Sequence, residues 1–295
     1  MGDRLAALLA SASVEISSKG SQLKELADHF AAGTDVSITF LPGDNYRHNV
    51  KTAVSLRCAG FNPVPHIAAR EMSSREALND FLASARREAD VRRLVLIAGD
   101  VAAAKGPFRS SFDVAVTGLI EAHGISSVSV AGYPEGHPWL DRGPAFDALA
   151  AWRDWAARSG VRVEIVTQFC FESAPILGWL GELGARGIDL PVKVGLAGPA
   201  TLATLTKFGL RCGIGGSMRA LRGQIGRLGR LLTDNGPDEV VRGLMAAPPS
   251  ATSAIAGFHL FPFGGLRKAG LWLREFEREL QVPPGAAAQG AARIP

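Results

Sequence analysis

The stretch Val161-Arg-Val-Glu-Ile-Val-Thr-Gln-Phe-Cys-Phe171 decides how the rest of the chain is interpreted. It begins as a strand, because its β-branched residues are interrupted only by one arginine and one glutamate. It ends in Thr-Gln-Phe, where an amide lies between a hydroxyl and an aromatic ring. Barrels carry their catalytic groups where strands end in polar residues. We therefore expect Gln168 to point into a ligand site, and Phe169 or Phe171 to form a wall of that site.

Further runs of this kind occur along the 295 residues, separated by longer amphipathic segments. Repeated strand–helix alternation is typical of a (β/α)8 barrel. A doubly wound sheet would place a GxGxxG turn after the first strand, but the sequence there reads Ser17-Ser-Lys-Gly20. We predict an α/β fold, a single-domain (β/α)8 TIM barrel over residues 1–281, followed by a flexible Pro/Gly/Ala-rich tail over 282–295. The expected strands span residues 13–17, 35–41, 62–68, 93–100, 126–134, 162–171, 191–197 and 254–263.

Amphipathic patterns predict helices between these strands. The segment 73–89 opens with Ser73 and Glu76, which have the spacing of a capping box. The connection after residue 197 is long enough for several helices, and Gly213-Ile-Gly-Gly216 is expected to be a helix–helix turn within it. The expected helices span residues 21–32, 45–58, 73–89, 109–123, 144–159, 173–186, 199–208, 217–232, 238–245 and 267–280.

Composition limits the classes of function. The hydrophobic fraction of 47% supports a sizeable core, and the net charge of +4 comes from scattered basic residues. The densest basic run, residues 219–230, is spaced by glycine and leucine like a solvated helix face, so no nucleic-acid partner is expected. No apolar run is long enough to cross a membrane, and the N-terminal segment is too short for a secretory signal. A homo-oligomer is compatible with the sequence.

The chain contains three cysteines, which form no CxxC pair. Free thiols favour a reducing compartment, so we expect a cytoplasmic protein. Cys170 lies in the opening stretch with no histidine near it in sequence, and we interpret it as a small apolar filler rather than a nucleophile.

Polar side chains gather at the expected C-terminal ends of the strands, which face the active site in a barrel. A carboxyl inside an apolar strand, such as Glu15 between Val14 and Ile16, generally has either a partner or a function. The convergence of several strands on one end predicts a single ligand site. The candidates are Glu15, Thr39, His66, Asp100 after Gly99, Tyr133 and His137 in Gly132-Tyr-Pro-Glu-Gly-His-Pro138, Gln168 and Lys193.

Several candidates also have a purely structural interpretation. Glu15 could pair with Lys193 inside the barrel, Asp100 could cap the next helix, and His66 could be a hydrogen-bonded core histidine. A metal site is disfavoured because no HxH or HxxE spacing pre-orients the ligands, and we expect no metal. A serine hydrolase is disfavoured because the sequence contains no GxSxG elbow.

Taken together, these motifs resemble the catalytic domain of the methylenetetrahydrofolate reductase family. The resemblance covers residues 14–280, nearly the whole chain. It is most specific in the Tyr-Pro-Glu-Gly-His-Pro and Thr-Gln-Phe motifs. The matching segments are a glutamate in the first strand, Pro65-His66, Gly99-Asp100, Gly132–Pro138, Thr167–Phe171 and Gly257-Phe-His-Leu-Phe261.

The resemblance implies a barrel that binds FAD and reduces 5,10-methylenetetrahydrofolate to 5-methyltetrahydrofolate with NADH or NADPH, in one-carbon metabolism and methionine biosynthesis. It implies that Glu15 is the general acid, that Asp100 lies beside the flavin and the pterin, and that Gln168 hydrogen-bonds the folate. Further folate contacts are implied for Phe169, Phe171 and Arg267, and flavin contacts for Thr39, His66, Gly99, Asp100, Tyr133 and His137.

The residue types suit that chemistry. Opening the imidazolidine ring of the substrate needs a proton on the departing nitrogen, which a partly buried carboxyl such as Glu15 can supply near neutral pH. The resulting iminium is cationic, and a carboxylate such as Asp100 would stabilise it. A pterin edge presents donors and acceptors that the Gln168 amide can meet in pairs.

Two departures from the family pattern concern FAD. The residue before Gly-Asp is Ala98 where the family has arginine, and the helix after the Tyr-Pro-Glu motif has Arg153 as its only cation where the family has an Arg-Lys pair for the phosphates. Fewer charge-assisted contacts predict weak, altered or absent FAD binding. Without FAD, hydride would pass directly from the nicotinamide to the folate. The alternatives are a folate-dependent methyl-transfer enzyme and a ligand-binding barrel without redox activity.

Overall fold

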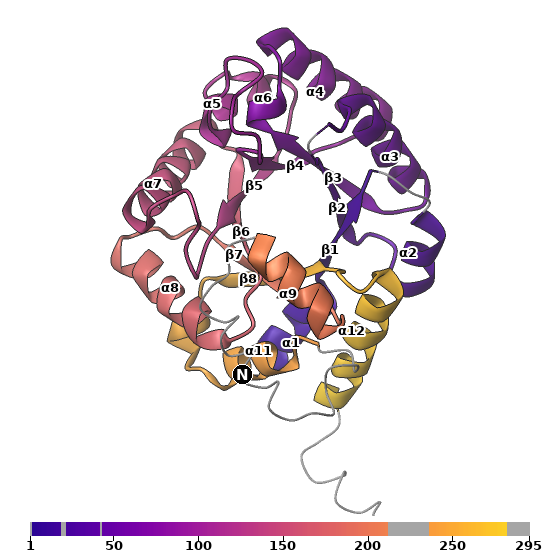
Figure 1. Cartoon of the computed structure of the whole chain (residues 1–295), viewed down its shortest axis with the longest axis vertical. Helices are drawn as coiled ribbons and strands as arrows, with labels where there is room; N and C mark the ends of the chain where they lie inside the picture. The colour runs from indigo at the N-terminus through magenta and orange to yellow at the C-terminus, as the bar shows by residue number, and fades with distance from the viewer. Residues whose placement is uncertain (1, 19–21, 42, 212–235, 282–295) are drawn as a thin grey trace, which may run out of the picture.

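The computed structural model describes residues 2–18, 22–41, 43–211 and 236–281. Eight parallel strands form a closed barrel in sequence order, which confirms the predicted fold, and β8 closes it against β1 with Ser13 opposite His259 (Figure 1). The strands are β1 (Ser13–Ser17), β2 (Asp35–Thr39), β3 (Asn62–Ala68), β4 (Arg93–Ile97), β5 (Ser127–Gly132), β6 (Arg162–Thr167), β7 (Val192–Ala197) and β8 (Ile255–Phe261).

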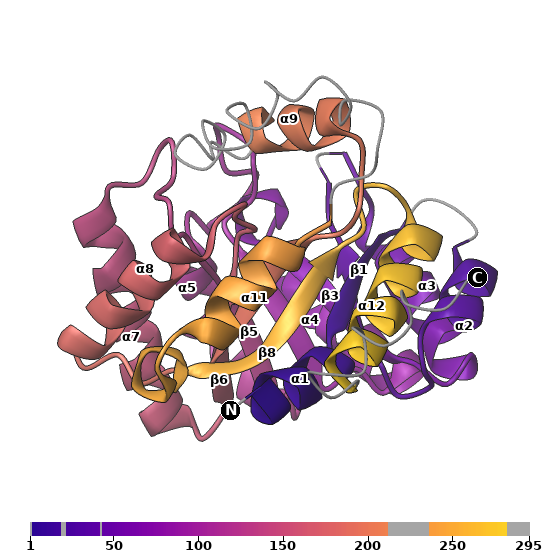
Figure 2. The ribbon, with the colours of Figure 1, turned by 90° about the horizontal axis from the view of Figure 1, so that it is seen from below.

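Helices surround the barrel, and two of them lie at its ends. In Figure 2, α9 lies over the end where the strands finish, and α1 lies at the opposite end. The helices are α1 (Gly2–Ala10), α2 (Leu23–His29), α3 (Tyr46–Cys58), α4 (Arg75–Ala89), α5 (Ser111–Ala115), α6 (Leu119–Ala122), α7 (Arg142–Ser159), α8 (Ser173–Ala185), α9 (Leu202–Arg211), α11 (Asp238–Ala246) and α12 (Leu266–Gln281), with short 3-10 turns η1 (Ala69–Glu71) and η3 (Pro249–Thr252).

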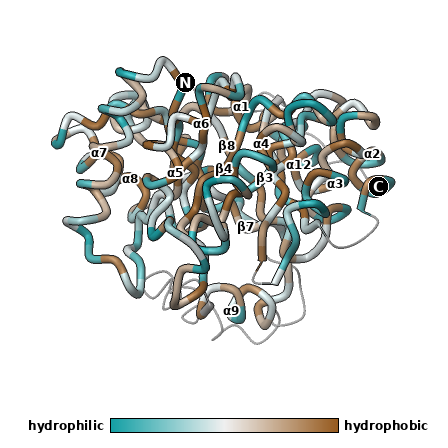
Figure 3. Tube along the Cα trace, turned by 90° about the horizontal axis from the view of Figure 1, so that it is seen from above, coloured by the Kyte–Doolittle hydropathy of each residue, from teal (hydrophilic) through white to brown (hydrophobic). Residues whose placement is uncertain are grey.

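The hydrophobic core lies between the barrel and its helices. Successive residues of a strand point to opposite faces, so one face of each strand can be apolar and the other polar. On β1, Val14 and Ile16 are buried in the core that continues through the helices, whereas Glu15 points into the barrel. In Figure 3, hydrophobic segments gather in the middle of the molecule and hydrophilic ones along its outer turns.

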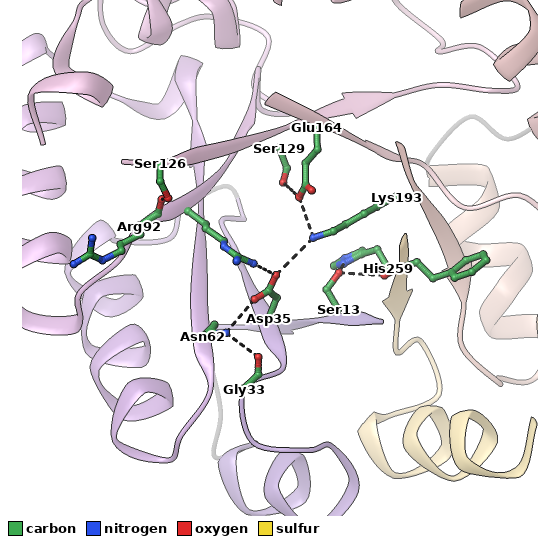
Figure 4. A network of polar contacts seen from close by, with 12 residues as sticks. Ser13, Gly33, Asp35, Asn62, Arg92, Ser126, Ser129, Glu164, Lys193 and His259 are labelled. Atoms are coloured by element: carbon green, nitrogen blue, oxygen red, sulfur yellow. Dashed lines mark hydrogen bonds and ion pairs between the residues drawn. The ribbon is translucent and has the colours of Figure 1, made fainter. Parts of the chain in front are cut away.

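The N-terminal end of the barrel interior is filled by charges of both signs. Lys193 Nζ lies 3.0 Å from Glu164 Oε1 and 3.6 Å from Asp35 Oδ2, and Arg93 also pairs with Asp35. Ser129 Oγ donates to Glu164 Oε1 at 2.7 Å. These side chains come from β2, β4, β5, β6 and β7, and Figure 4 shows Asp35, Ser129, Glu164 and Lys193 meeting inside the ring. Two cations therefore balance two carboxylates where solvation by bulk water is limited.

This network corrects two expectations about Lys193. It is the second residue of β7, so it lies near the N-terminal end of that strand and not at the catalytic end. Its partners are Asp35 and Glu164 rather than Glu15. The absence of a side chain at Gly257 gives the Lys193 stem room, because a Cβ there would lie 3.3 Å from Lys193 Cγ.

Several predicted boundaries were wrong for local reasons. The expected helix 109–123 is divided into α5 and α6 by Gly118, whose φ of +73° a side-chain-bearing residue adopts only with strain. α4 begins at Arg75, two residues later than expected, because Ser74 and not Ser73 is its N-cap and accepts from Ala77 N at 3.1 Å. The helix α1 was not anticipated. Residues 213–216, 219–230 and 282–295 and the expected helix 217–232 lie outside the described residues.

Removing Lys193 should destabilise the fold. Lys193→Met removes a positive charge that offsets the negative charges of Asp35 and Glu164. Deleting one partner of a largely buried ion pair lowers the free energy of unfolding by about 3 kcal/mol. Urea denaturation measures this change. Lys51→Met, at an exposed lysine of α3, is the control and should change the free energy of unfolding by less than about 0.5 kcal/mol. Equal stability of the two variants would contradict a structural role for the network.

Candidate active site at the C-terminal mouth of the barrel

A cavity of about 150 Å³ lies inside the barrel, beyond the charge network toward the C-terminal ends of the strands. It brings together Glu15, His66, Tyr133 and Gln168 of the predicted site residues. These four come from β1, β3, the end of β5 and the end of β6, so the barrel joins positions that are far apart in sequence. The other residues of its lining are Ser37, Val95, Ile97, Val130, Ala131, Val166, Thr167, His259 and Phe261.

The Glu15 carboxylate lies between two histidine rings. Its Oε2 is 3.6 Å from His66 Nε2 and 3.9 Å from His259 Nε2, close but beyond normal hydrogen-bond length. The Glu15 side chain retains 21% of its accessible surface, whereas both histidines are buried. His259 Nδ1 lies 2.9 Å from Ser13 Oγ, and this contact orients the ring so that Nε2 faces Glu15.

Burial makes His66 a neutral ring. Its pKa is lowered to about 4, chiefly by desolvation; the nearby Glu15 carboxylate raises the pKa and His259 lowers it. At neutral pH His66 therefore cannot form an ion pair with Glu15. Glu15 therefore has no fixed positive charge at His66, and its carboxylate faces the cavity.

Close backbone packing places Gln168 at the cavity. Gln168 N donates to Gly132 O at 2.8 Å, which extends the β5–β6 pairing by one residue. Thr167 Oγ1 accepts from Gly195 N at 2.9 Å. A Cβ on Gly195 would lie 2.2 Å from Thr167 O and 2.8 Å from the Phe261 ring, so only glycine lets β7 approach there.

The aromatic wall of the cavity comes from β8 rather than from β6. Phe261 lines the cavity, and Phe169 packs behind it with ring centroids 5.8 Å apart. Phe169 belongs to a second hydrophobic cluster with Ala197, Ala200, Leu202 and Leu205, against which Phe171 also packs. This cluster anchors α9 over the mouth, where Phe208 stacks on Phe263 at 4.2 Å.

Tyr133 is a neutral phenol at the rim of the cavity. Burial, together with the nearby Asp100 carboxylate, raises its pKa to about 12. Asp100 itself is exposed and lies outside the cavity lining. Partial burial lowers the pKa of His137, and the negative charge of Asp100 partly offsets this by raising it. Asp100 therefore lies at the outer mouth beside Tyr133 and His137, and it does not cap the next helix, which Ser110 caps.

The loop that carries Asp100 is bound to the η1 turn. Arg70 Nε donates to Arg109 O at 2.9 Å and Arg70 Nη1 to Val101 O at 3.4 Å, so one guanidinium joins both ends of the loop. Lys105 in the same loop pairs with the buried Glu71. At the start of the loop, Gly99 turns the chain out of β4 with φ of +92°.

The remaining predicted residues lie further out. Thr39 ends β2 with its Oγ1 buried, and among the described residues that oxygen has no hydrogen-bond partner. Arg267 is exposed in the first turn of α12, where its backbone N–H donates to Glu25 Oε1 at 2.8 Å. The cavity lining includes neither residue. Cys170 is buried, and burial together with Glu135 raises the pKa of its thiol, as suits an unreactive filler.

Sequence reasoning missed His259, Ser37 and Phe261 as lining residues. A signal for His259 and Phe261 was present in the period-two pattern of β8, where they share one strand face and the core residues Phe258 and Leu260 occupy the other. Ser37 follows the same rule on β2, opposite Glu15 in the β1–β2 register.

The described cations do not fit the phosphates of FAD at the position that the resemblance implies. Arg153 donates to Gly187 O at 2.8 Å, in the loop before β7 and thus toward the opposite end of the barrel. Arg142, at the start of α7, is engaged with Glu182 and with Pro134 O. Within the described ranges no cluster of ligands suits a metal ion, and no helix is long and apolar enough to span a membrane.

Solved structures of other proteins align with this chain over nearly its whole length. No protein-family model matches the chain. An uncharacterized protein from Clostridium thermocellum that binds two copies of 5-methyl-5,6,7,8-tetrahydrofolic acid aligns with a TM-score of 0.60 at 7% identity, covering 94% of this chain and 99% of that one. Dihydropteroate synthase from Thermus thermophilus aligns with a TM-score of 0.47 at 15% identity, covering 92% of this chain and 95% of that one, which is too distant to support an inference.

The buried His66 should make the free energy of unfolding fall at acidic pH. Its folded pKa is depressed, so the unfolded chain binds a proton that the folded chain refuses, and the free energy of unfolding falls as pH falls from about 6.5 toward 4. Since each tenfold change in proton affinity corresponds to about 1.4 kcal/mol, the full effect is about 3 kcal/mol. Denaturation of wild type and His66→Asn across this range measures it.

His66→Asn should lack this part of the pH dependence, whereas His48→Asn, at an exposed histidine of α3, should retain it. An identical pH dependence in wild type and His66→Asn would show that His66 titrates normally.

Proposed function

We propose that the protein is a folate oxidoreductase that reduces 5,10-methylenetetrahydrofolate to 5-methyltetrahydrofolate with a reduced nicotinamide, NADH or NADPH. The observation that carries this proposal is the cavity in which the Glu15 carboxylate faces a neutral His66 and shares the space with Gln168 and Tyr133. The binding of 5-methyltetrahydrofolic acid by a protein of the same fold supports a folate ligand.

The size of the cavity favours one ring system. Drug-sized ligands generally occupy roughly 300–1,000 Å³, whereas this cavity measures about 150 Å³. A pterin therefore suits it better than a pterin together with an isoalloxazine. The engagement of Arg153 and Arg142 with other groups, among the described residues, agrees with this size. We therefore assign no step to a flavin. A nicotinamide substrate needs only micromolar to millimolar affinity and can bind with fewer contacts than a resident cofactor.

The proposed roles follow from position. Gln168 binds the pterin edge through its amide, which both donates and accepts. Glu15 donates a proton to the departing nitrogen of the imidazolidine ring as its bond to the methylene carbon breaks. Asp100, at the outer mouth, stabilises the cationic iminium that results. Hydride from the dihydronicotinamide then reduces that carbon to methyl, and the nicotinamide leaves in its oxidised form.

Phe261 and the second hydrophobic cluster, which packs behind it and anchors α9, exclude water from the reacting carbon. Phe261 lines the cavity and contacts His259 with ring centroids 4.8 Å apart, so one side of the site is apolar. Excluding water strengthens the interaction of the carboxylates with a cationic intermediate and protects the iminium from hydrolysis. A methyl-transfer enzyme could use the same pterin pocket, but it would not oxidise a nicotinamide.

Replacing Glu15 should separate binding from reaction. Glu15→Gln keeps the shape of the side chain but cannot donate the proton, so we expect kcat for methylenetetrahydrofolate-dependent NADH oxidation to fall about a hundredfold or more. The dissociation constant for 5-methyltetrahydrofolate, measured by isothermal titration calorimetry, should change by less than about threefold. Glu121→Gln, on the exposed surface of α6, is the matched control. Full activity of Glu15→Gln would refute the assignment of the proton donor.

A further inference from the structure

The loop after β5 presents a large aromatic side chain to solvent. Trp139 is 79% exposed, although an indole is a large apolar surface. Its neighbours Pro138 and Asp141 are also exposed. A single exposed indole suits one flat ring better than a protein partner, because stable protein interfaces bury far larger areas.

Trp139 continues a ladder of rings that begins inside the cavity. Tyr133 lines the cavity, and its ring centroid lies 4.6 Å from that of His137. The His137 ring in turn lies 5.6 Å from the indole of Trp139. The planes of neighbouring rings are inclined by 52° and 73°, so the three rings form a tilted, edge-to-face series from the cavity to the outside of the molecule.

The backbone holds this ladder in place. Trp139 N donates to His137 Nδ1 at 3.3 Å, and residues His137 and Leu140 form an isolated antiparallel bridge. Gly136 turns the chain before His137 with φ of +90°. Because Nδ1 accepts a hydrogen bond, the proton of the neutral imidazole lies on Nε2, where it can be donated to a ligand.

The proposed reaction requires a second flat molecule at this place. The cavity has room for one ring system, so the dihydronicotinamide must approach the pterin from the mouth. The donor carries a second aromatic ring, its adenine, joined to the first by a flexible diphosphate. A ladder that starts beside the pterin and ends in an exposed indole matches a ligand with two separated rings.

We propose that the ladder of Tyr133, His137 and Trp139 binds the reduced dinucleotide, with the dihydronicotinamide against Tyr133 and His137 and the adenine stacked on Trp139. This inference rests on the proposed function, since it assigns the position of the second substrate. It makes Trp139 a residue that recognises the part of the donor remote from the reacting carbon.

The test compares two donors. NADH carries adenine, whereas reduced nicotinamide mononucleotide delivers the same hydride without it. Stacking of a base on an aromatic side chain is worth roughly 1–3 kcal/mol, so Trp139→Ala should raise KM for NADH about tenfold. The same variant should leave KM for reduced nicotinamide mononucleotide and kcat for either donor within about twofold. Trp139→Phe should retain most of the affinity for NADH, and Val116→Ala, at another exposed apolar residue, is the control.

An unchanged KM for NADH in Trp139→Ala, or an equal rise for both donors, would overturn the inference while leaving the proposed function intact. If the wild-type protein shows no methylenetetrahydrofolate-dependent NADH oxidation, the proposed function fails instead. Fluorescence titration with NADH alone then decides about Trp139. Binding that is weakened about tenfold by Trp139→Ala supports the stacking site, and absent or unaltered binding rules it out.

Discussion

The polar lining of the barrel interior constrains the rest of the structure. The inward faces of the strands carry apolar residues such as Val95, Ile97 and Val166. Among them lie carboxylates, imidazoles, hydroxyls and the cations Lys193 and Arg93, which must satisfy one another. At the N-terminal end this requirement is met by Lys193 and Arg93, which balance Asp35 and Glu164. These pairings engage both cations, and within the described part of the chain no lysine or arginine forms an ion pair with Glu15.

The properties of the mouth follow from the pairing of Lys193 and Arg93 with other carboxylates than Glu15. Glu15 faces two imidazoles, of which His66 is kept neutral by burial, so His66 does not hold the Glu15 carboxylate in a fixed ion pair. Asp100 lies outside the cavity, in the loop after β4. Arg70 holds both ends of that loop by hydrogen bonds to Val101 O and Arg109 O. In the proposed reaction these different surroundings suit Glu15 to proton transfer and Asp100 to stabilising positive charge.

The overall fold could be predicted because period two in the strands and longer amphipathic segments between them are local properties of the sequence. Glu15, His66, Tyr133 and Gln168 could be assigned to one site because the ends of parallel strands meet in a barrel. Lys193 was misplaced, since sequence order does not say how far along its strand a residue lies relative to the mouth. His259 was missed because the period-two pattern of β8 separates it from Phe258 and Leu260 but does not say which of the two faces points into the barrel. The break at Gly118 depends on a positive φ that composition alone does not specify.

The central claim is direct reduction of a folate-bound carbon in the Glu15 cavity, without a flavin between donor and acceptor. The most direct test uses NADH deuterated at the transferred position of the nicotinamide, with methylenetetrahydrofolate and purified protein without added flavin, and mass spectrometry of the product. The account predicts 5-methyltetrahydrofolate that carries the deuterium in its methyl group. Product without deuterium would indicate a carrier that exchanges with solvent, and absence of 5-methyltetrahydrofolate would contradict the assigned reaction.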